Sequence, residues 1–176
     1  MSELLNSKKG EIIMTVELSE KIKDENSWEF YVDKLYKLCT QGNYTKAVEV
    51  CEIGLSKAGR IPILLSYMGY ILYEMKQYEN AIKYYTESIK IDDFDHLSFY
   101  YRGLCYYGLQ NYEMAIKDSN SVLEIIEISS KAYYLRSISE KELNQKEKAL
   151  SDIDMAIKYD PENQLYKDER DLILKM

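Results

Sequence analysis

The residues that could perform chemistry in this 176-residue sequence are few and are not arranged for catalysis. The single histidine, His96, follows Asp95, but a general base would also need a nucleophile or an acid supplied by a motif. The sequence contains no glycine-rich phosphate loop and no nucleophile elbow. The acidic pairs Asp92–Asp93 and Asp152–Asp154 are typical of solvated helix ends and helix surfaces. We therefore predict a protein that is not an enzyme and that uses no cofactor.

Cysteine offers no metal or redox chemistry either. Cys39, Cys51 and Cys105 form no CxxC motif and have no histidine beside them. An odd number of cysteines with this spacing indicates neither a disulfide framework nor a zinc site. We expect all three to be reduced side chains that serve packing.

Tyrosine is the residue whose number and spacing could serve binding, because the chain has 18 of them. Tyrosine provides a large contact area at a low cost in conformational entropy, and its hydroxyl can pair with polar groups. Whether these rings bind a partner or pack inside the fold depends on the elements that carry them.

Those elements follow from a phrase that recurs four times at a constant interval. It reads NYTKAV from residue 43, QYENAI from 77, NYEMAI from 111 and QKEKAL from 145, so Ala47, Ala81, Ala115 and Ala149 are each 34 residues apart. Both halves of a copy carry apolar residues at helical spacing, with a short polar stretch between them. Each copy is expected to form two helices and a turn.

Other columns align when the alanine is numbered position 20 of the repeat. Position 1 then falls at Trp28, Pro62, His96 and Ser130. Position 8 is small in three copies and position 17 is tyrosine in three. A small residue that faces an alanine lets two helix backbones approach closely. Asp95 and Ser130 are predicted to cap helix N-termini.

A 34-residue period with small residues at positions 8 and 20 and aromatic residues near 11, 17 and 24 resembles the tetratricopeptide repeat family, over about residues 28–161. The resemblance implies an all-α fold, a right-handed α-solenoid of four helical hairpins. Terminal repeats are expected to be atypical, and here Leu35 stands at position 8 and Glu140 at position 11. The expected segments are an N-terminal arm, partly helical or mobile, at 1–27, repeats at 28–61, 62–95, 96–129 and 130–161, and a capping helix at 162–176 whose apolar residues are Leu165, Leu172 and Ile173.

The resemblance also separates the tyrosines into two sets. Those at positions 4, 11, 17 and 24 are explained by packing. In this family the first helices line a concave groove, into which positions 2, 5, 9 and 12 point. The predicted groove residues at positions 5, 9 and 12 are Tyr36, Tyr70, Tyr73, Tyr100, Leu104, Tyr107, Tyr134 and Ile138. The alternative interpretation is that some of these rings pack between repeats.

The best-known ligand mode of the family is a clamp of Lys, Asn and Arg side chains for an acidic C-terminal carboxylate. The corresponding positions here hold Val32, Tyr36, Tyr67, Leu97 and Tyr101. No cation or amide stands among them, and a carboxylate bound there would lack charge-assisted donors. Binding to the acidic tails of Hsp70-type or Hsp90-type chaperones is therefore not expected.

The leading hypothesis is a non-catalytic adaptor or scaffold whose tyrosine-rich groove holds an extended or helical protein segment with apolar or aromatic anchors. The alternative is a small acidic chaperone of the type III secretion translocator kind. A net charge of -7 disfavours nucleic acid and favours a basic partner. The sequence has no signal-peptide run and no stretch that would insert into a membrane, so a cytoplasmic location is expected. Whether the chain forms a homodimer is left open.

Overall fold

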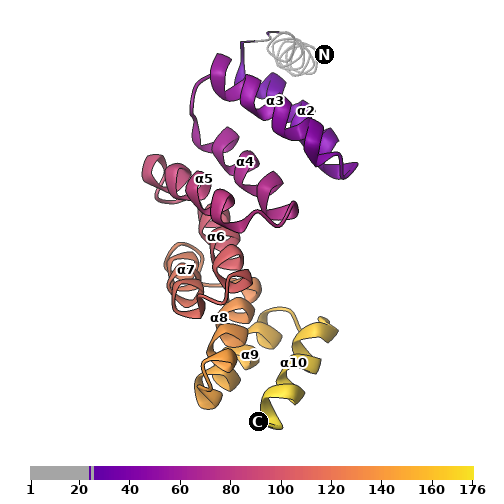
Figure 1. Cartoon of the computed structure of the whole chain (residues 1–176). Coiled ribbons are helices and arrows are strands. Elements are labelled where there is room, and N and C mark those ends of the chain that lie inside the picture. Colours follow the sequence, from indigo (N-terminus) through magenta and orange to yellow (C-terminus); the bar gives the residue numbers. More distant parts are fainter. Residues whose placement is uncertain (1–23, 25) are drawn as a thin grey trace, which may run out of the picture.

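The computed structural model describes residue 24 and residues 26–176, and this part of the chain folds into helices joined by short turns (Figure 1). The predicted N-terminal arm, residues 1–27, lies almost entirely outside the described residues. The helices are α2 (Trp28–Thr40), α3 (Tyr44–Lys57), α4 (Pro62–Glu74), α5 (Tyr78–Ile91), α6 (His96–Gly108), α7 (Tyr112–Ile125), α8 (Ser130–Glu142), α9 (Lys146–Tyr159) and α10 (Gln164–Leu174).

The helix boundaries follow the sequence period. The first helices α2, α4, α6 and α8 begin at position 1 of the repeat, and α10 begins at the same position one interval later. Each turn inside a hairpin places its position 15 in the left-handed region, at Gly42, Lys76, Gln110 and Asn144. The predicted all-α helical repeat solenoid is confirmed.

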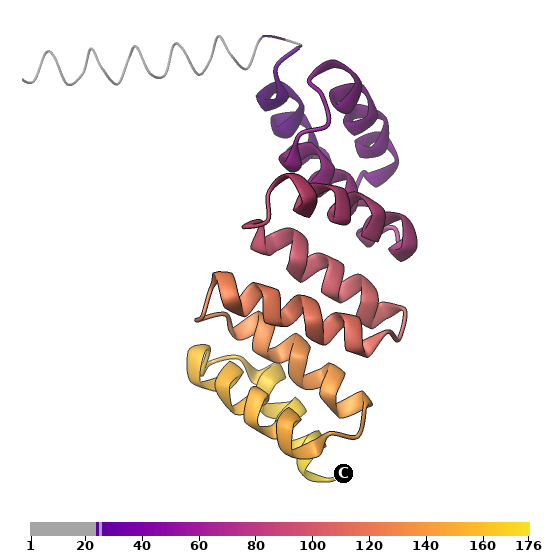
Figure 2. The ribbon, with the colours of Figure 1, turned by 90° about the vertical axis from the view of Figure 1, so that its left-hand side faces the viewer.

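The hairpins stack one after another along the array (Figure 2), and the first helices contact one another in one layer. Each first helix packs on its own second helix and also contacts the first helix of the next repeat, from α2 through to α10. The second helices α3, α5, α7 and α9 make no comparable contact with one another. First helices that lie closer together place their layer on the inner side of the curved array.

A short polar side chain caps the N-terminus of α2, α6, α7 and α8, but not always the residue we predicted. The Asp95 carboxylate accepts a hydrogen bond from the Ser98 amide, which confirms its capping role. At α8 the cap is Ser129, whose hydroxyl accepts from the Ala132 amide, and Ser130 is the first helical residue. The prediction for Ser130 was therefore wrong by one position.

The interior changes character along the array. In the first half it is apolar, with Leu35, Leu64, Leu65 and Met68 almost fully buried. Leu35 thus occupies the usually small position 8 of the first repeat as a core residue. In the second half the buried residues include several polar side chains, namely Asp118, Ser119, Ser137, Ser139, Glu140, Asp152 and Glu169.

The cysteines are free thiols, in agreement with the sequence. Cys51 and Cys105 are buried, and burial raises the pKa of each thiol to about 12. They therefore stay protonated and serve packing. Within the described residues, none of the helices combines the length and the apolar character that a membrane crossing needs.

An arginine at position 7 joins successive hairpins in the second half of the array. Arg102 donates two hydrogen bonds to the Asp118 carboxylate, at 2.8 and 2.7 Å, and a third of 3.1 Å to the Thr86 hydroxyl of the preceding repeat. Arg136 repeats this pattern with Asp152 and Asn120. Each arginine therefore links its own hairpin to the hairpin before it, through bidentate geometry that lysine could not supply.

The C-terminal helix α10 packs against α8 and α9. Its contact residues are Tyr166 and Ile173, which lie in a cluster with Ile153 of α9. Of the three apolar residues noted in the sequence, only Ile173 is buried, whereas Leu165 and Leu172 are exposed.

Glu140 is a buried carboxyl on α8 with an unusual ionisation. One of its carboxyl oxygens, Oε2, has no hydrogen-bond partner among the described residues. Burial, followed by the nearby charge of Asp152, raises its pKa from 4.5 to about 7, against opposing effects of Arg136 and Lys148. The folded state therefore holds a proton on Glu140 that the unfolded state has lost between pH 4.5 and 7.

This shift predicts a pH-dependent effect of Glu140→Gln. A raised carboxyl pKa contributes stability that is present below about pH 4.5 and is lost as pH rises through 7. Glutamine does not ionise, so at pH 8 the variant should be more stable than the wild type by about 1–2 kcal/mol, with partial solvent screening limiting the gain. Urea unfolding at pH 5 and pH 8 tests this, and an equal difference at both values would refute it.

Candidate functional site

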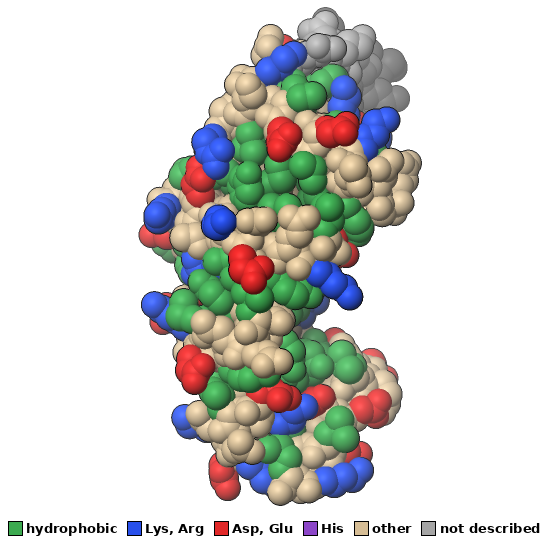
Figure 3. Space-filling view, in the orientation of Figure 1, with side chains coloured by type: hydrophobic (Ala, Val, Ile, Leu, Met, Phe, Trp, Pro, Cys, Tyr) green, Lys and Arg blue, Asp and Glu red, His purple; other side chains and the backbone are tan. Residues whose placement is uncertain are grey.

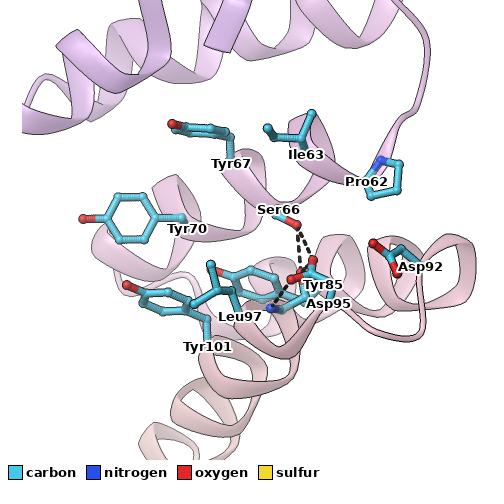
Figure 4. A pocket seen from close by; sticks show the side chains of 11 residues that line it. Pro62, Ile63, Ser66, Tyr67, Tyr70, Tyr85, Asp92, Asp95, Leu97 and Tyr101 are labelled. Atoms are coloured by element: carbon cyan, nitrogen blue, oxygen red, sulfur yellow. Dashed lines mark hydrogen bonds between the residues drawn. The ribbon is translucent and has the colours of Figure 1, made fainter. Parts of the chain in front are cut away.

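A cavity lies on the inner layer between α4 and α6, and we call it the α4–α6 pocket (Figure 4). Its volume is about 570 Å³. Its lining residues are Pro62, Ile63, Ser66, Tyr67, Tyr70, Tyr85, Asp92, Asp95, Leu97, Ser98 and Tyr101. On the surface, apolar side chains gather over α4 in the upper half of the molecule (Figure 3).

The walls of the pocket are built from an aromatic cluster centred on Tyr101. This ring packs edge-on against Tyr70 and Tyr73, with centroids 5.5 and 5.6 Å apart, and stacks on Tyr85 at 6.2 Å. It also meets Tyr100 of its own helix at 5.5 Å. Such ring pairs stabilise one another beyond the area they bury. The cluster therefore holds the pocket walls in place while leaving Tyr70 and Tyr101 half-exposed.

The floor of the pocket is polar. The Ser66 hydroxyl donates to the Asp95 carboxylate at 3.0 Å and lies 2.9 and 2.8 Å from the hydroxyls of Ser88 and Ser98. Ser88 in turn donates to the Pro62 carbonyl at 3.1 Å. Because Asp95 also caps α6, the start of this helix and the pocket floor are fixed by one network.

The electrostatics of the pocket are one-sided. Asp92 and Asp95 are its only charged lining residues, and neither has an ion-pair partner among the described residues. Further along α4, Glu74 accepts a hydrogen bond from the Tyr44 hydroxyl at 3.2 Å. Burial and then the Glu74 charge raise the pKa of Tyr70, so its hydroxyl stays neutral at physiological pH.

Tyr85 contributes a buried hydroxyl to the same pocket. The residue is 1% exposed, and its Oη atom has no hydrogen-bond partner among the described residues. Burial strongly raises the pKa of this phenol, which therefore remains protonated. Figure 4 shows the ring beside Tyr101 and behind Leu97. Buried polar groups normally have partners, so this hydroxyl is an exception that calls for a reason.

We predict that Tyr85→Phe stabilises the isolated protein. An unpaired buried hydroxyl costs its desolvation without a compensating bond, so its removal should raise the free energy of unfolding by about 1 kcal/mol. Chemical denaturation measures the change. A loss of stability of similar size would show that the hydroxyl is bonded in the free protein.

The eight groove residues predicted from the sequence occupy different environments. Tyr70 lines the α4–α6 pocket, and Tyr73 and Tyr100 are half-buried members of the aromatic cluster beside it. Tyr36 is 61% exposed on α2. Leu104 is half-buried on α6, outside the pocket.

The remaining three predicted residues lie toward the C-terminal end. Tyr107 packs edge-on against Tyr112, with centroids 5.5 Å apart. Tyr134 stacks on Tyr166 of α10 at 4.8 Å, and Ile138 is only 7% exposed. The structure thus brings some predicted residues to one pocket and packs others against neighbouring elements.

Several pocket residues were missing from the sequence-based set. Tyr67, Leu97 and Tyr101 stand at clamp positions, where the sequence-based prediction uses them only as evidence that a cation or amide is absent. Their apolar and aromatic character was the available signal. Asp92 and Tyr85 come from other parts of the repeat and had no such signal.

Comparison with known proteins agrees with this architecture. The model of the family described as "Tetratricopeptide repeat" matches residues 62–95, the segment that contains α4 and α5. A search of curated proteins finds no match for the sequence. The described residues contain no group of side chains suited to hold a metal ion.

Solved structures provide the clearest likeness. The chain matches MamA from Desulfovibrio magneticus RS-1 with a TM-score of 0.75 and 19% identity, covering 88% of this chain and 92% of that one. It matches YrrB, described as a TPR protein with an unusual peptide-binding site, with a TM-score of 0.74, 20% identity and coverages of 84% and 76%. It also matches the second TPR domain of human RPAP3, solved with an HSP70 peptide, with a TM-score of 0.62 and 26% identity. That match covers 65% of this chain and 99% of the RPAP3 domain.

The stacked hairpins with an inner layer of first helices define a helical repeat solenoid. Residues 62–95 match the tetratricopeptide repeat family, and the described chain shares its fold with YrrB, a solved tetratricopeptide repeat protein.

Proposed function

We propose that this protein is a non-catalytic binding module whose inner, tyrosine-rich face holds a segment of another protein. The observation that carries the proposal is the α4–α6 pocket, an aromatic cavity on the layer of first helices. Its volume of about 570 Å³ falls in the range of pockets that enclose a few side chains. It therefore suits the anchors of a peptide segment better than the flat face of a folded domain.

The walls favour apolar or aromatic anchors. Tyr67, Tyr70 and Leu97 surround the opening with rings and an aliphatic side chain, and their neighbours hold them in place. Tyrosines in a fixed arrangement offer contact area without losing much freedom on binding. Their hydroxyls can pair with the exposed backbone of an extended or helical segment.

Acidic tails fit this face poorly. The HSP70 peptide bound by the RPAP3 domain, SGPTIEEVD, ends in acidic residues. In this chain the α4–α6 pocket presents Asp92 and Asp95, and none of its described lining residues is a cation. We therefore infer that the bound segment differs in chemistry from those peptides.

Peptide selection tests the proposal. A phage-displayed library of random 12-residue peptides is selected on the wild-type protein, and the enriched peptides are measured by fluorescence polarisation. Because central aromatic contacts dominate binding energies, Tyr70→Ala should weaken binding at least about 10-fold. Tyr84→Ala is the matched control, since Tyr84 is a half-buried tyrosine on α5 outside the α4–α6 pocket.

The fold of both variants is checked by circular dichroism. Selection of no peptide, or of peptides that bind the Tyr70→Ala variant as tightly as the wild type, would overturn the proposal.

A further inference from the structure

The α4–α6 pocket carries negative charge at one end and aromatic rings at the other. Figure 4 shows Asp92 beside Pro62 at one end, whereas Tyr67 and Tyr70 lie toward the opposite end. None of the described residues that line the pocket is a lysine, arginine or histidine. The combination offers a carboxylate for a cation and ring faces for the alkyl stem that carries it.

The two carboxylates differ in how far they are already engaged. Asp95 accepts hydrogen bonds from the Ser98 amide and from serine hydroxyls, so it is held in place as a fixed negative charge. Within the described part of the chain, the Asp92 carboxylate accepts a hydrogen bond only from the Phe94 amide, at 3.1 Å, and the residue is exposed. Asp92 therefore retains acceptor capacity for a ligand, and Asp95 adds to the local potential.

The Tyr85 hydroxyl is an independent indication of a polar ligand group. It is buried at the wall of this pocket without a partner, and a phenol oxygen can accept a hydrogen bond from a donor that enters. Guanidinium carries five donors and also stacks on tyrosine faces, which suits a site of rings with scattered acceptors.

We propose that the α4–α6 pocket takes an arginine or lysine side chain of the bound polypeptide segment. The stem packs against Tyr67, Leu97 and Tyr101, and the cationic head group lies at the end formed by Asp92 and Asp95. This inference rests on the proposed function, because it names the side chain that the same pocket selects. Apolar residues on either side of the basic residue contact the remaining aromatic surface.

The charge of the whole molecule supports a basic partner. The chain has 23 basic and 30 acidic residues, so a cationic segment is attracted before contact. At the pocket itself, an acidic side chain would meet Asp92 and Asp95 with no cation to offset the repulsion. A neutral apolar anchor would pack against the tyrosine rings but would leave the carboxylates at the other end of the pocket without a partner.

The same peptide library, selected on three proteins, provides the test. The proteins are the wild type, Asp92→Asn, and Asp93→Asn as the matched control. Both substitutions remove one negative charge from the same loop, but only Asp92 lines the pocket. Asparagine can still accept the hydrogen bond from the Phe94 amide. We expect arginine or lysine to be enriched at one fixed position on the wild type and on Asp93→Asn, and the enrichment to be lost on Asp92→Asn.

A second measurement quantifies how much the positive charge of the peptide's basic residue contributes to binding. In the best wild-type peptide the arginine is replaced by citrulline, which keeps the shape and removes the charge. Loss of charge-assisted hydrogen bonds should weaken binding about 10-fold, and Asp92→Asn should weaken binding of the arginine peptide about 5-fold. Raising the salt concentration should weaken the arginine peptide more than the citrulline peptide.

The outcomes separate the inference from the proposed function. Peptides that depend on Tyr70 but carry no basic residue, or that bind equally with citrulline, would overturn the inference and leave the proposed function standing. An equal effect of Asp92→Asn and Asp93→Asn would overturn it too, since the charge would then act only from a distance. The absence of any peptide that depends on Tyr70 would overturn both.

Discussion

Asp118→Ala should lower the free energy of unfolding by about 3–5 kcal/mol, because it leaves the buried guanidinium of Arg102 without its counter-ion. The Asp118 side chain is 1% exposed and accepts two hydrogen bonds from Arg102, and that arginine also bonds Thr86 of the preceding repeat. The substitution therefore disturbs one hairpin and its junction with the hairpin before it. Urea denaturation followed by circular dichroism measures the loss.

An exposed ion pair between α9 and α10 serves as the control. Arg170 donates to Asp154, but both side chains are largely solvated. Removal of such a pair lowers the free energy of unfolding only slightly, so Asp154→Ala should leave the denaturation midpoint nearly unchanged. If Asp118→Ala were as mild as Asp154→Ala, the buried arginines would not be what joins these hairpins.

Gly69→Ala is the second substitution with a large expected effect. A Cβ atom built on Gly69 would lie 2.7 Å from Cε1 and 2.8 Å from Cζ of Tyr85, well inside normal contact distance. The Tyr85 ring is buried and stacks on Tyr101, so it has little room to move. Overpacking of this kind costs about 1–3 kcal/mol, although alanine alone would favour the helix by about 1 kcal/mol.

A double-mutant cycle identifies the cause. In a Tyr85→Leu background the ring is gone, and Gly69→Ala should then be neutral or stabilising, which would reveal coupling between the two positions. Equal effects of Gly69→Ala in both backgrounds would mean that contact with the Tyr85 ring is not the reason why position 69 requires glycine.

The 34-residue period predicted the helices well, because helix boundaries found in one repeat apply at the same positions of the other three. The constant spacing of Ala47, Ala81, Ala115 and Ala149 required equal helices and turns, and the observed first helices begin at the expected residues. The N-cap residue of α8 could not be identified from the sequence in the same way. Ser129 and Ser130 are chemically alike, and the hydroxyl of either could accept a hydrogen bond from a backbone amide of the first turn.

The buried polar residues could not be predicted in the same way. Arg102 and Asp118 lie 16 residues apart, and the sequence alone gives no sign that their side chains pair inside the fold. In the sequence, Glu140 is distinguished only by standing at a position where the repeat usually has an aromatic residue. Its burial depends on how α8 and α9 pack, which is a property of the three-dimensional arrangement.

The candidate site was predicted in part. Helical spacing placed Tyr70 and its neighbours on one face, and the aromatic cluster lies there. It could not show that Tyr134 stacks on α10, because that contact depends on where the last helix packs. It also could not show that Asp92, from a loop, and Tyr85, from a second helix, line the same pocket.

The most direct test of peptide binding on the inner face is a nuclear magnetic resonance titration of the labelled full chain with the tightest selected peptide. The account predicts the largest shift changes on α4 and α6, at Ile63, Tyr67, Tyr70, Leu97 and Tyr101. Saturation of these shifts with a single dissociation constant would place the ligand in the α4–α6 pocket. Shift changes confined to the second helices α5, α7 and α9 would contradict the account.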